Sequence, residues 1–442
     1  MLGIVRIRRL LPTEVIKGLA LPLTYSSAFF VIFLALFGKN EFGIYFLVYL
    51  LPLKNVRDKL LSFPGGSDII DWVLLALSIT LLFKIFSKKN QIILCSKTRN
   101  IIIGYIFITM VYLFWGSFYF GIDLPITMGN DRLINWKNHI ILPLLFFLTF
   151  HHVSEKKQIK VVVILIFISL AFVSRHYLST AHTSGHFLWD RRGSGIFSHL
   201  GPNELAAFLS NYSIIALSFF FSESSKLFRG MCAFLYGFTG LAILFTYSRG
   251  TYIAFMVSSI FIIFIRKRVL LIVLLVIALC WQLYLPDTVV ERIEMTRQGG
   301  QQTFESSSAG RLKLWTHGIK LFLKNPLGYG YNTVHMLGFV NYHENRKNND
   351  PHNRFVEFMV EMGIVGIALF TGILYYSFRS GWYLFKQSND FFYRSLGLGF
   401  SACVISVAIT NIFGDRWSYV EVGCYFWVVW ALVERARTAA TE

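Results

Sequence analysis

Thirteen apolar runs fill most of this chain, and they constrain its fold more than any other feature of the sequence. Most of them are long enough to cross the ~30 Å hydrocarbon core of a lipid bilayer as a helix. They lie near residues 19–37, 40–54, 69–86, 101–121, 138–152, 159–174, 203–221, 229–247, 251–265, 269–285, 355–378, 393–411 and 417–434. The sequence therefore predicts an all-α, polytopic membrane protein.

The composition supports this class and excludes several others. Of the 442 residues 55% are hydrophobic and 15% are charged, which is too apolar for a soluble protein of this size. The net charge of +18 comes from Lys and Arg in short clusters between apolar runs, so it indicates cytoplasmic loops and not a nucleic-acid surface. The five cysteines form no Cys-x-x-Cys pair, and we expect neither a disulfide framework nor a zinc knuckle.

The basic clusters also predict the topology. Five Lys and Arg residues between 84 and 99 mark a cytoplasmic loop, and further clusters mark alternate loops after it. The loops 122–137, 175–202, 286–353 and 412–416 are then exported, together with the 247–250 turn. The basic residues 6–9 break this alternation: either one early run is re-entrant or interfacial, giving about twelve spans, or the N-terminus is exported, giving thirteen. We favour twelve.

The chain reads as one membrane domain over residues 1–442, with no separate soluble domain. Its longest loop, 286–353, is predicted to hold an amphipathic helix. Leu312, Trp315, Ile319 and Phe322 recur at helical spacing between lysines, and Pro326 ends the run. We expect this helix to lie at the membrane interface and to cover the site beneath it.

A His-Asn pair closes this loop, where the chain re-enters an apolar run. Pro351 biases the residue before it toward extended geometry, so a helix is expected to begin near His352 and Asn353. A neutral imidazole can accept a proton near neutral pH, and an asparagine can orient a hydroxyl group or the ring. Gly363 and Gly366 let a neighbouring helix approach closely. His352 and Asn353 are therefore candidates for chemistry, although an ordinary helix cap would use the same residues.

Two arginines lie where an anion would stabilise them. Arg249 stands in Tyr-Ser-Arg-Gly-Thr between two apolar runs, and an arginine at membrane depth is costly unless it meets an anion. Arg311 opens the amphipathic segment in Ala-Gly-Arg-Leu-Lys-Leu-Trp. Two guanidinium groups suit a pyrophosphate, because each holds two oxygens and stays charged at physiological pH. The alternative is that both contact lipid headgroups.

Other polar residues carry weaker predictions. Arg192, in an exported loop, is a candidate phosphate or sugar contact. Glu357 is expected to pair with Arg354 along the helix after His352, or else to orient His352 or an acceptor sugar. The histidines of loop 175–202 lack the spacing of a metalloprotease helix, and we expect no metal. The chain has no Gly-x-x-x-x-Gly-Lys loop and no Asp-x-Asp pair, which favours a lipid-linked donor and no cofactor.

These segments resemble the bacterial O-antigen ligase and O-antigen polymerase superfamily of membrane glycosyltransferases. The shared features are His-Asn followed after nine residues by Gly-x-x-Gly, the Ser-Arg-Gly turn, Gly-Arg before a Trp-bearing helix with a later Pro-Leu-Gly-x-Gly turn, and Pro-Asn-Glu-Leu-Ala at 202–206. The resemblance is specific over roughly 190–370 and only topological elsewhere.

The resemblance implies a metal-independent, inverting transferase in the bacterial inner membrane. It would take a glycan from undecaprenyl diphosphate at the periplasmic face. Arg249 and Arg311 would bind the diphosphate, His352 would serve as base or hydrogen-bond acceptor for the attacking hydroxyl, and Asn353 would position it. The acceptor is a lipid A-core sugar in a ligase of lipopolysaccharide synthesis, and a second carrier-linked glycan in an O-antigen or exopolysaccharide polymerase.

We favour the ligase because the chain is compact, with one dominant exported loop. A lipid-linked oligosaccharide flippase is the rival from another class. A flippase would predict inverted repeats and charges along a midplane cavity, whereas here the candidate charges gather at one face.

Overall fold

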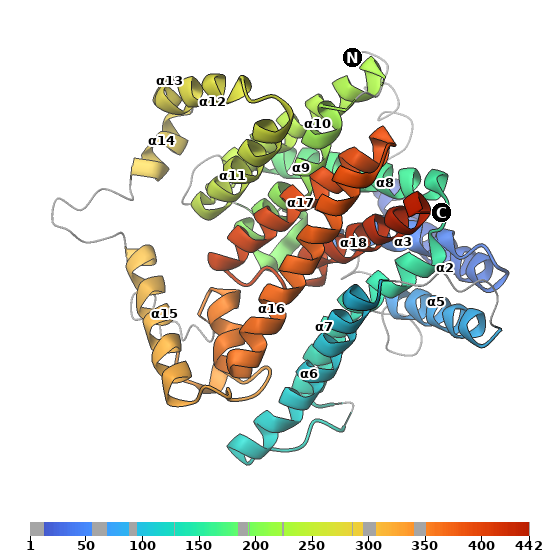
Figure 1. The fold of residues 1–442 in the computed structure, drawn as a ribbon, viewed down its shortest axis with the longest axis vertical. Coiled ribbons are helices and arrows are strands. Elements are labelled where there is room, and N and C mark those ends of the chain that lie inside the picture. Colours follow the sequence, from blue (N-terminus) through green and yellow to red (C-terminus); the bar gives the residue numbers. More distant parts are fainter. Residues whose placement is uncertain are drawn as a thin grey trace.

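The computed structural model describes residues 13–54, 69–87, 95–127, 129–183, 193, 195–222, 225–284, 286–294, 306–339 and 351–441, and all regular structure in these ranges is helical. In chain order the helices are α2 (Thr13–Leu36), α3 (Glu41–Leu50), α5 (Ile69–Phe86), α6 (Ser96–Phe120), α7 (Asp131–His152), α8 (Lys156–Thr183), η2 (Gly195–Leu200), α9 (Pro202–Phe220), α10 (Lys226–Phe245), α11 (Arg249–Arg266), α12 (Leu270–Leu279), α13 (Trp281–Tyr284), α14 (Asp287–Glu294), α15 (Ser306–Lys324), η3 (Val334–Met336), α16 (Arg354–Gln387), α17 (Phe391–Ile412) and α18 (Val420–Thr441) (Figure 1).

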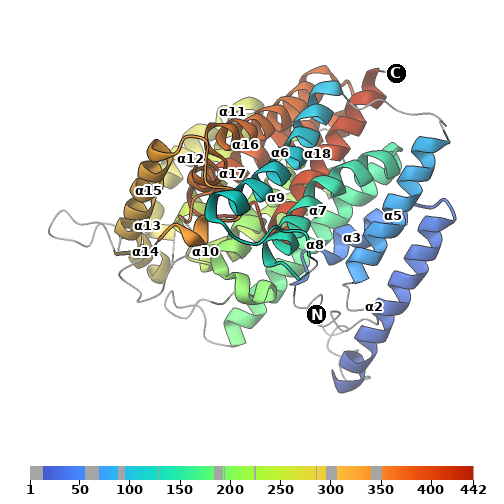
Figure 2. The same ribbon diagram turned by 90° about the horizontal axis from the view of Figure 1, so that it is seen from below.

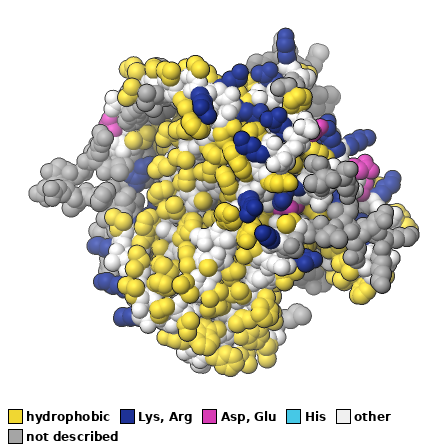
Figure 3. All heavy atoms as spheres, viewed as in Figure 1, with side chains coloured by type: hydrophobic (Ala, Val, Ile, Leu, Met, Phe, Trp, Pro, Cys, Tyr) yellow, Lys and Arg dark blue, Asp and Glu magenta, His cyan; other side chains and the backbone are white. Residues whose placement is uncertain are grey.

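The predicted polytopic helical architecture is confirmed. Within the described residues, eight helices are long and apolar enough to cross a membrane: α5, α6, α7, α8, α10, α11, α16 and α17. Two further helices of similar length, α9 and α18, lie inside the bundle against these spans. Apolar side chains cover much of the centre and the lower part of the face shown in Figure 3, as expected for a surface that lipid surrounds.

Two of the thirteen apolar runs form shorter helices than their length suggested. The run near 40–54 forms α3, whose ten residues extend only about 15 Å at the α-helical rise per residue. The run near 269–285 is divided at Cys280 into α12 and the four-residue α13. A helix of α3's length is too short to cross a ~30 Å core alone, which fits the alternative of an early re-entrant or interfacial run.

Helix α17 lies at the centre of the bundle because glycines let its neighbours approach closely on two faces. Gly397 of α17 lies against Gly381 of α16, so that a Cβ on either would meet the other's carbonyl oxygen within 2.7 Å. Gly399 lies against the backbone of Ile215 in α9. Close contact of small residues is a main source of helix association in membranes, where burial of apolar surface adds little.

The long α16 is not one continuous helix. Gly363 has φ 59° and ψ −146°, which interrupts the helical hydrogen bonds and separates the short N-terminal segment 354–362 from the rest. The turn 326–331 of the large loop fills the break. Its hydrogen bonds run from Tyr329 N–H to Val360 C=O (3.1 Å), from Gly330 N–H to Glu361 C=O (2.7 Å) and from Ile364 N–H to Pro326 C=O (3.0 Å). The loop is therefore built into the bundle.

Two buried charged side chains hold the inserted loop from opposite sides. Arg132 of α7 donates from Nη2 to the carbonyl oxygens of Leu113 (2.6 Å) and Tyr331 (3.1 Å). On the other side, Glu361 Oε1 accepts a hydrogen bond from the backbone N–H of Thr333 (3.1 Å). Residues 326–333 of the loop are thus fixed against α6, α7 and α16.

We expect Gly363→Ala to destabilise the protein. A Cβ at this position would collide with the carbonyl of Pro326, and the positive φ is strained for any other residue, which costs about 1–3 kcal/mol before the collision is counted. The midpoint of thermal unfolding in detergent should fall clearly. Gly104→Ala in α6, where a Cβ meets no atom within 4 Å, is the matched control and should be neutral or slightly stabilising. An unchanged midpoint for Gly363→Ala would contradict the inserted-loop geometry.

Candidate functional site

Backbone strain marks the segments that the sequence analysis selected. Among the described residues, three non-glycine residues have positive φ: Tyr247 (55°), Asn332 (57°) and His352 (49°). Tyr247 lies two residues before Arg249, Asn332 follows the Pro-Leu-Gly-Tyr-Gly turn, and His352 is the candidate base. Non-glycine residues in this region are uncommon and cluster at functional sites, where the surrounding structure holds them in place.

His352 and Asn353 lie at the N-terminus of α16, as the sequence predicts, but they have different surroundings. His352 is partly exposed, whereas Pro351 and Asn353 beside it are buried. Asn353 is the helix cap: its Oδ1 accepts hydrogen bonds from the backbone N–H groups of Phe355 (2.9 Å) and Val356 (3.2 Å). The cap fixes the start of α16 and, with it, the turn that carries the imidazole.

Helix α15 lies directly beside this turn. The indole Nε1 of Trp315 donates to the carbonyl oxygen of Pro351 (3.1 Å), and Gly318 lies so close to Val356 that a Cβ there would collide with its side chain. Arg311 precedes Trp315 by four residues and therefore lies on the same side of the helix, one turn away. The structure thus brings Arg311 to the neighbourhood of His352, and Figure 1 shows α15 alongside the N-terminal part of α16.

The expected apolar stripe of α15 is present but divided. Leu314 and Gly318 are the buried positions against α16, while Leu312 and Ile319 are each 46% exposed and Leu323 is 70% exposed. Lysines lie on the same exposed side, at 313, 320 and 324. One face of α15 therefore packs on the protein, and the remaining apolar side chains are available to lipid.

Arg249 is the first residue of α11 and reaches the same region through another turn. Gly250 lies against Phe413, which follows the end of α17, and a Cβ on Gly250 would meet the Phe413 side chain at 2.8 Å. Two residues further on, the Asp415 carboxylate lies 3.6 Å from the Arg354 guanidinium, at the start of α16. The α17–α18 turn therefore joins the segment of Arg249 to that of His352.

The sequence analysis did not identify Arg354 and Asp415 as a buried pair at this site. Arg354 is 2% exposed; its Nη1 lies 2.7 Å from Glu357 Oε1, and its guanidinium lies 4.1 Å above the ring of Phe358. The expected pairing of Arg354 with Glu357 is present. Glu357 was also a candidate substrate contact, and one of its carboxylate oxygens is bound to Arg354. The sequence feature that could have indicated this pair is Asp415-Arg416, two charged residues in a short turn between apolar runs.

Aromatic side chains pack beneath these charges. The indole of Trp417 donates to the Tyr105 hydroxyl (2.7 Å), which in turn contacts the imidazole of His139. The ring of Tyr331, from the inserted loop, lies 5.6 Å from that of His139. Burial raises the pKa of Tyr331 well above its ordinary value, so its hydroxyl stays protonated at neutral pH. This packed layer leaves the polar groups above it little freedom to move.

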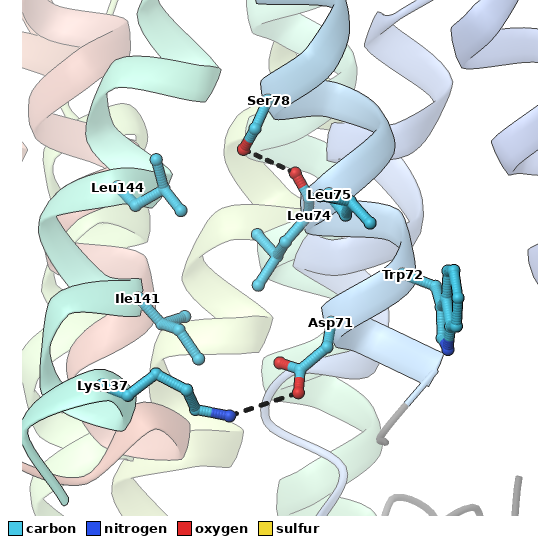
Figure 4. Close-up of a pocket in the computed structure, with 8 residues that line it drawn as sticks. All are labelled: Asp71, Trp72, Leu74, Leu75, Ser78, Lys137, Ile141 and Leu144. Atoms are coloured by element: carbon cyan, nitrogen blue, oxygen red, sulfur yellow. Dashed lines mark hydrogen bonds and ion pairs between the residues drawn. The ribbon is translucent and has the colours of Figure 1, made fainter. Parts of the chain in front are cut away.

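A separate groove lies between α5 and α7, on the opposite flank of the bundle from α15 (Figures 1, 2 and 4). Its volume is about 430 Å³, and apolar side chains such as Leu74 and Ile141 form most of its wall. Lys137 and Asp71 lie at one end and pair with each other at 3.2 Å. Because that pair neutralises itself, the groove is a poorer place for a diphosphate than the segment around Arg249 and Arg311.

Arg192 lies outside the described residues. Within the described ranges, no group of three or more His, Cys, Asp or Glu side chains is placed to hold a metal ion.

A comparison with known protein families gives a match on the segment that carries most of this geometry. Residues 233–371 match the model of a family described as O-antigen ligase. They include Arg249, Arg311, the inserted loop and the start of α16. No curated protein matches the chain.

Capping by Asn353 leads to a direct prediction. Asn353→Ala removes an acceptor from two N–H groups and should cost about 1 kcal/mol of stability, whereas Asn353→Ser, which keeps a capping oxygen, should cost much less. Thermal unfolding measures the stability of each variant, and a glycan-transfer assay measures its activity. If Asn353 acts through the cap, Ser restores both stability and transfer. Full stability without transfer in the Ser variant would instead mean that the amide contacts the substrate.

Proposed function

We propose that this chain is an O-antigen ligase, because residues 233–371 match a family of that description. It transfers a glycan from undecaprenyl diphosphate to a lipid A-core acceptor at the periplasmic face of the inner membrane. The observation that carries the proposal is the convergence of three turns at one end of the bundle. Arg249 is linked through Phe413 and Asp415 to the start of α16, and Arg311 is linked through Trp315 to Pro351.

The positions of the two arginines suit the departing group. In the proposed reaction the bond between the anomeric carbon and the diphosphate breaks, and negative charge develops on the diphosphate oxygens. Guanidinium groups fixed beforehand around that position stabilise the charge without having to reorganise. Arg249 comes from a membrane helix and Arg311 from α15, so the two can approach a diphosphate from different sides.

In this proposal His352 acts on the acceptor. Its imidazole accepts the proton of the attacking hydroxyl, or a hydrogen bond from it, while the hydroxyl oxygen attacks the anomeric carbon on the face opposite the diphosphate. The product has the inverted configuration, and no metal is needed in this scheme. Asn353 positions the imidazole by fixing the start of α16, and Glu357 acts through Arg354 in the same turn.

The orientation in the membrane follows from the basic residues. Lys84, Lys156 and Arg437 lie at helix ends remote from the three turns, in the company of His152, Asp390 and Glu434. Basic residues favour the cytoplasmic side. The end with His352 then faces the periplasm, and α15 covers it at the level of the lipid headgroups.

The acceptor distinguishes the ligase from the polymerase. In a strain that lacks this protein, surface glycans are separated by gel electrophoresis. Lipid A-core without attached chains, together with accumulated carrier-linked polymer, supports the ligase. Core that bears a single repeat unit would mean a polymerase that uses the same residues on a second carrier-linked glycan.

We expect His352→Ala to lower transfer by about 10²–10⁴-fold, the usual contribution of a general base, without lowering the amount of protein in the membrane. The residue is partly exposed at a helix end, so its loss leaves the packed interior intact. The matched control is His335→Ala, which removes an exposed histidine of the same loop. Full-length surface glycan in cells with normal levels of the His352→Ala protein would remove His352 from the mechanism.

The two arginines are tested as a pair. Arg→Lys at 249 or 311 keeps the charge but loses the two-pronged hydrogen bond, so recognition of the carrier should weaken by about 1–3 kcal/mol. Alanine should be worse at either position. If both arginines hold one diphosphate, the double Ala variant should cost less than the sum of the single variants. Transfer from purified carrier-linked glycan measures these effects.

Lys313→Ala controls for loss of an exposed positive charge on α15. Small, additive losses, with Lys as good as Arg at both positions, would indicate lipid-headgroup contacts instead of a diphosphate site.

A further inference from the structure

The turn between α17 and α18 contacts two of the segments that the proposed reaction uses, those of Arg249 and of His352. Phe413 lies against Gly250, beside Arg249. Asp415 lies 3.6 Å from Arg354, beside His352 and Asn353. The next residue, Arg416, pairs with Glu204 in the first turn of α9, with 2.8 Å between Nη1 and Oε1. The turn is thus tied to three helices that are distant in the sequence.

The Arg416–Glu204 ion pair is nearly buried and is closely fitted. The two side chains are 9% and 12% exposed. Arg416 Nη1 also donates to the carbonyl of Asp415 (3.1 Å), and the Arg416 backbone N–H donates to Asn411 Oδ1 (3.0 Å). The sequence analysis interpreted Glu204 as helix-start chemistry, and the structure adds this partner across the bundle.

Glycines on both sides make room for the pair. A Cβ on Gly414 would collide with the Arg416 guanidinium, and a Cβ on Gly201, which has φ 101°, would lie 2.9 Å from Glu204 Oε2. Both charged groups therefore fold back over a glycine of their own turn. The separation of the two charged groups is therefore fixed, because neither side chain can extend away from its turn without breaking the ion pair.

We propose that the Arg416–Glu204 pair is a positioning device for the transfer site, which sets where Arg249 lies relative to His352. In a site that excludes water, removing one partner leaves a buried charge without compensation. The α17–α18 turn would then move to solvate that charge, and Phe413 and Asp415 would move with it. Displacements of about 1 Å at such a site can lower a rate 10²-fold. The inference rests on the proposed function.

A different role for Arg416, direct binding of the diphosphate, is less favoured by the geometry. Its Nη1 is shared between Glu204 and the carbonyl of Asp415, and Gly414 lies against the remainder of the guanidinium. The two roles predict different kinetics. A positioning residue lowers kcat and changes the KM for the carrier little, whereas a diphosphate ligand raises KM.

The kinetic test uses full-length protein in detergent with carrier-linked glycan. Arg416→Ala and Glu204→Gln should each lower kcat by about 10- to 100-fold, with KM changed less than threefold. Arg416→Lys, which can keep the ion pair, should recover most of the loss. The double reversal Arg416→Glu with Glu204→Arg should be more active than either reversal alone. A normal rate for Glu204→Gln beside a raised KM for Arg416→Ala would overturn the proposal in favour of direct binding.

A matched control separates positioning from stability. Glu434 is 1% exposed, pairs with Arg437 and accepts a hydrogen bond from Thr98 (3.0 Å), at the end of α18 remote from the site. Glu434→Gln therefore also removes a buried carboxylate. If it lowers the unfolding midpoint as much as Glu204→Gln does, it should still keep kcat within about threefold. Equal losses of kcat in the two variants would reduce the role of Arg416 to general stability and overturn the inference.

A second measurement does not depend on transfer. Amide hydrogen exchange in the segments 247–253 and 352–357 should quicken about tenfold or more in Arg416→Ala and stay unchanged in Glu434→Gln, because the local opening free energy falls where support is lost. Unchanged exchange in both segments of Arg416→Ala would overturn the inference even if kcat falls as expected. If the wild-type protein transfers no glycan but exchange quickens as expected, the proposed function fails and the positioning role of the pair stands.

Discussion

The structure depends on a constraint that lipid imposes: each backbone N–H and C=O must find a partner within the protein. At Gly363 the helix α16 breaks this pattern, and the turn 326–331 supplies the missing partners to Val360, Glu361 and Ile364. Because those hydrogen bonds lie inside the bundle, they hold the 326–331 part of the large loop in a fixed position against α16. Helix α15, which ends at Lys324 just before the turn, is fixed as well, and Trp315 can therefore bond to the carbonyl of Pro351.

Buried charge adds a second set of constraints at the same end of the bundle. A charge in low dielectric needs a partner at short distance, and each such pair therefore fixes two elements relative to each other. Arg132 holds the inserted loop, Arg354 holds Asp415, and Arg416 holds Glu204. The turns at this end of the bundle are accordingly positioned by ion pairs and hydrogen bonds, while the middle of the bundle is positioned by glycine contacts such as Gly381 with Gly397.

The sequence predicted much of this site because its signals are local. Apolar runs and basic clusters identify spans and their ends, and Pro351 with the His-Asn pair after it identifies the start of α16. Other features depend on residues far apart in the chain. The pairing of Glu204 with Arg416, the contact of Gly250 with Phe413 and the division of α15 into a packed and an exposed side have no periodic signature. Short helices were also poorly predicted, because α3 and the break at Cys280 lie inside runs of uniform hydropathy.

By itself the sequence determined the class of protein and most of its helical spans, and it selected His352, Arg249 and Arg311 as candidates, since hydropathy and charge act on each segment separately. The tertiary structure alone decided which residues support them. It paired Glu204 with Arg416, fixed the inserted loop through Arg132, and placed the α17–α18 turn between the helices that carry the candidate groups. The physical reason is that a buried charge or an interrupted helix is stabilised by whichever partner the packing brings within about 3 Å, and that partner can lie anywhere in the chain.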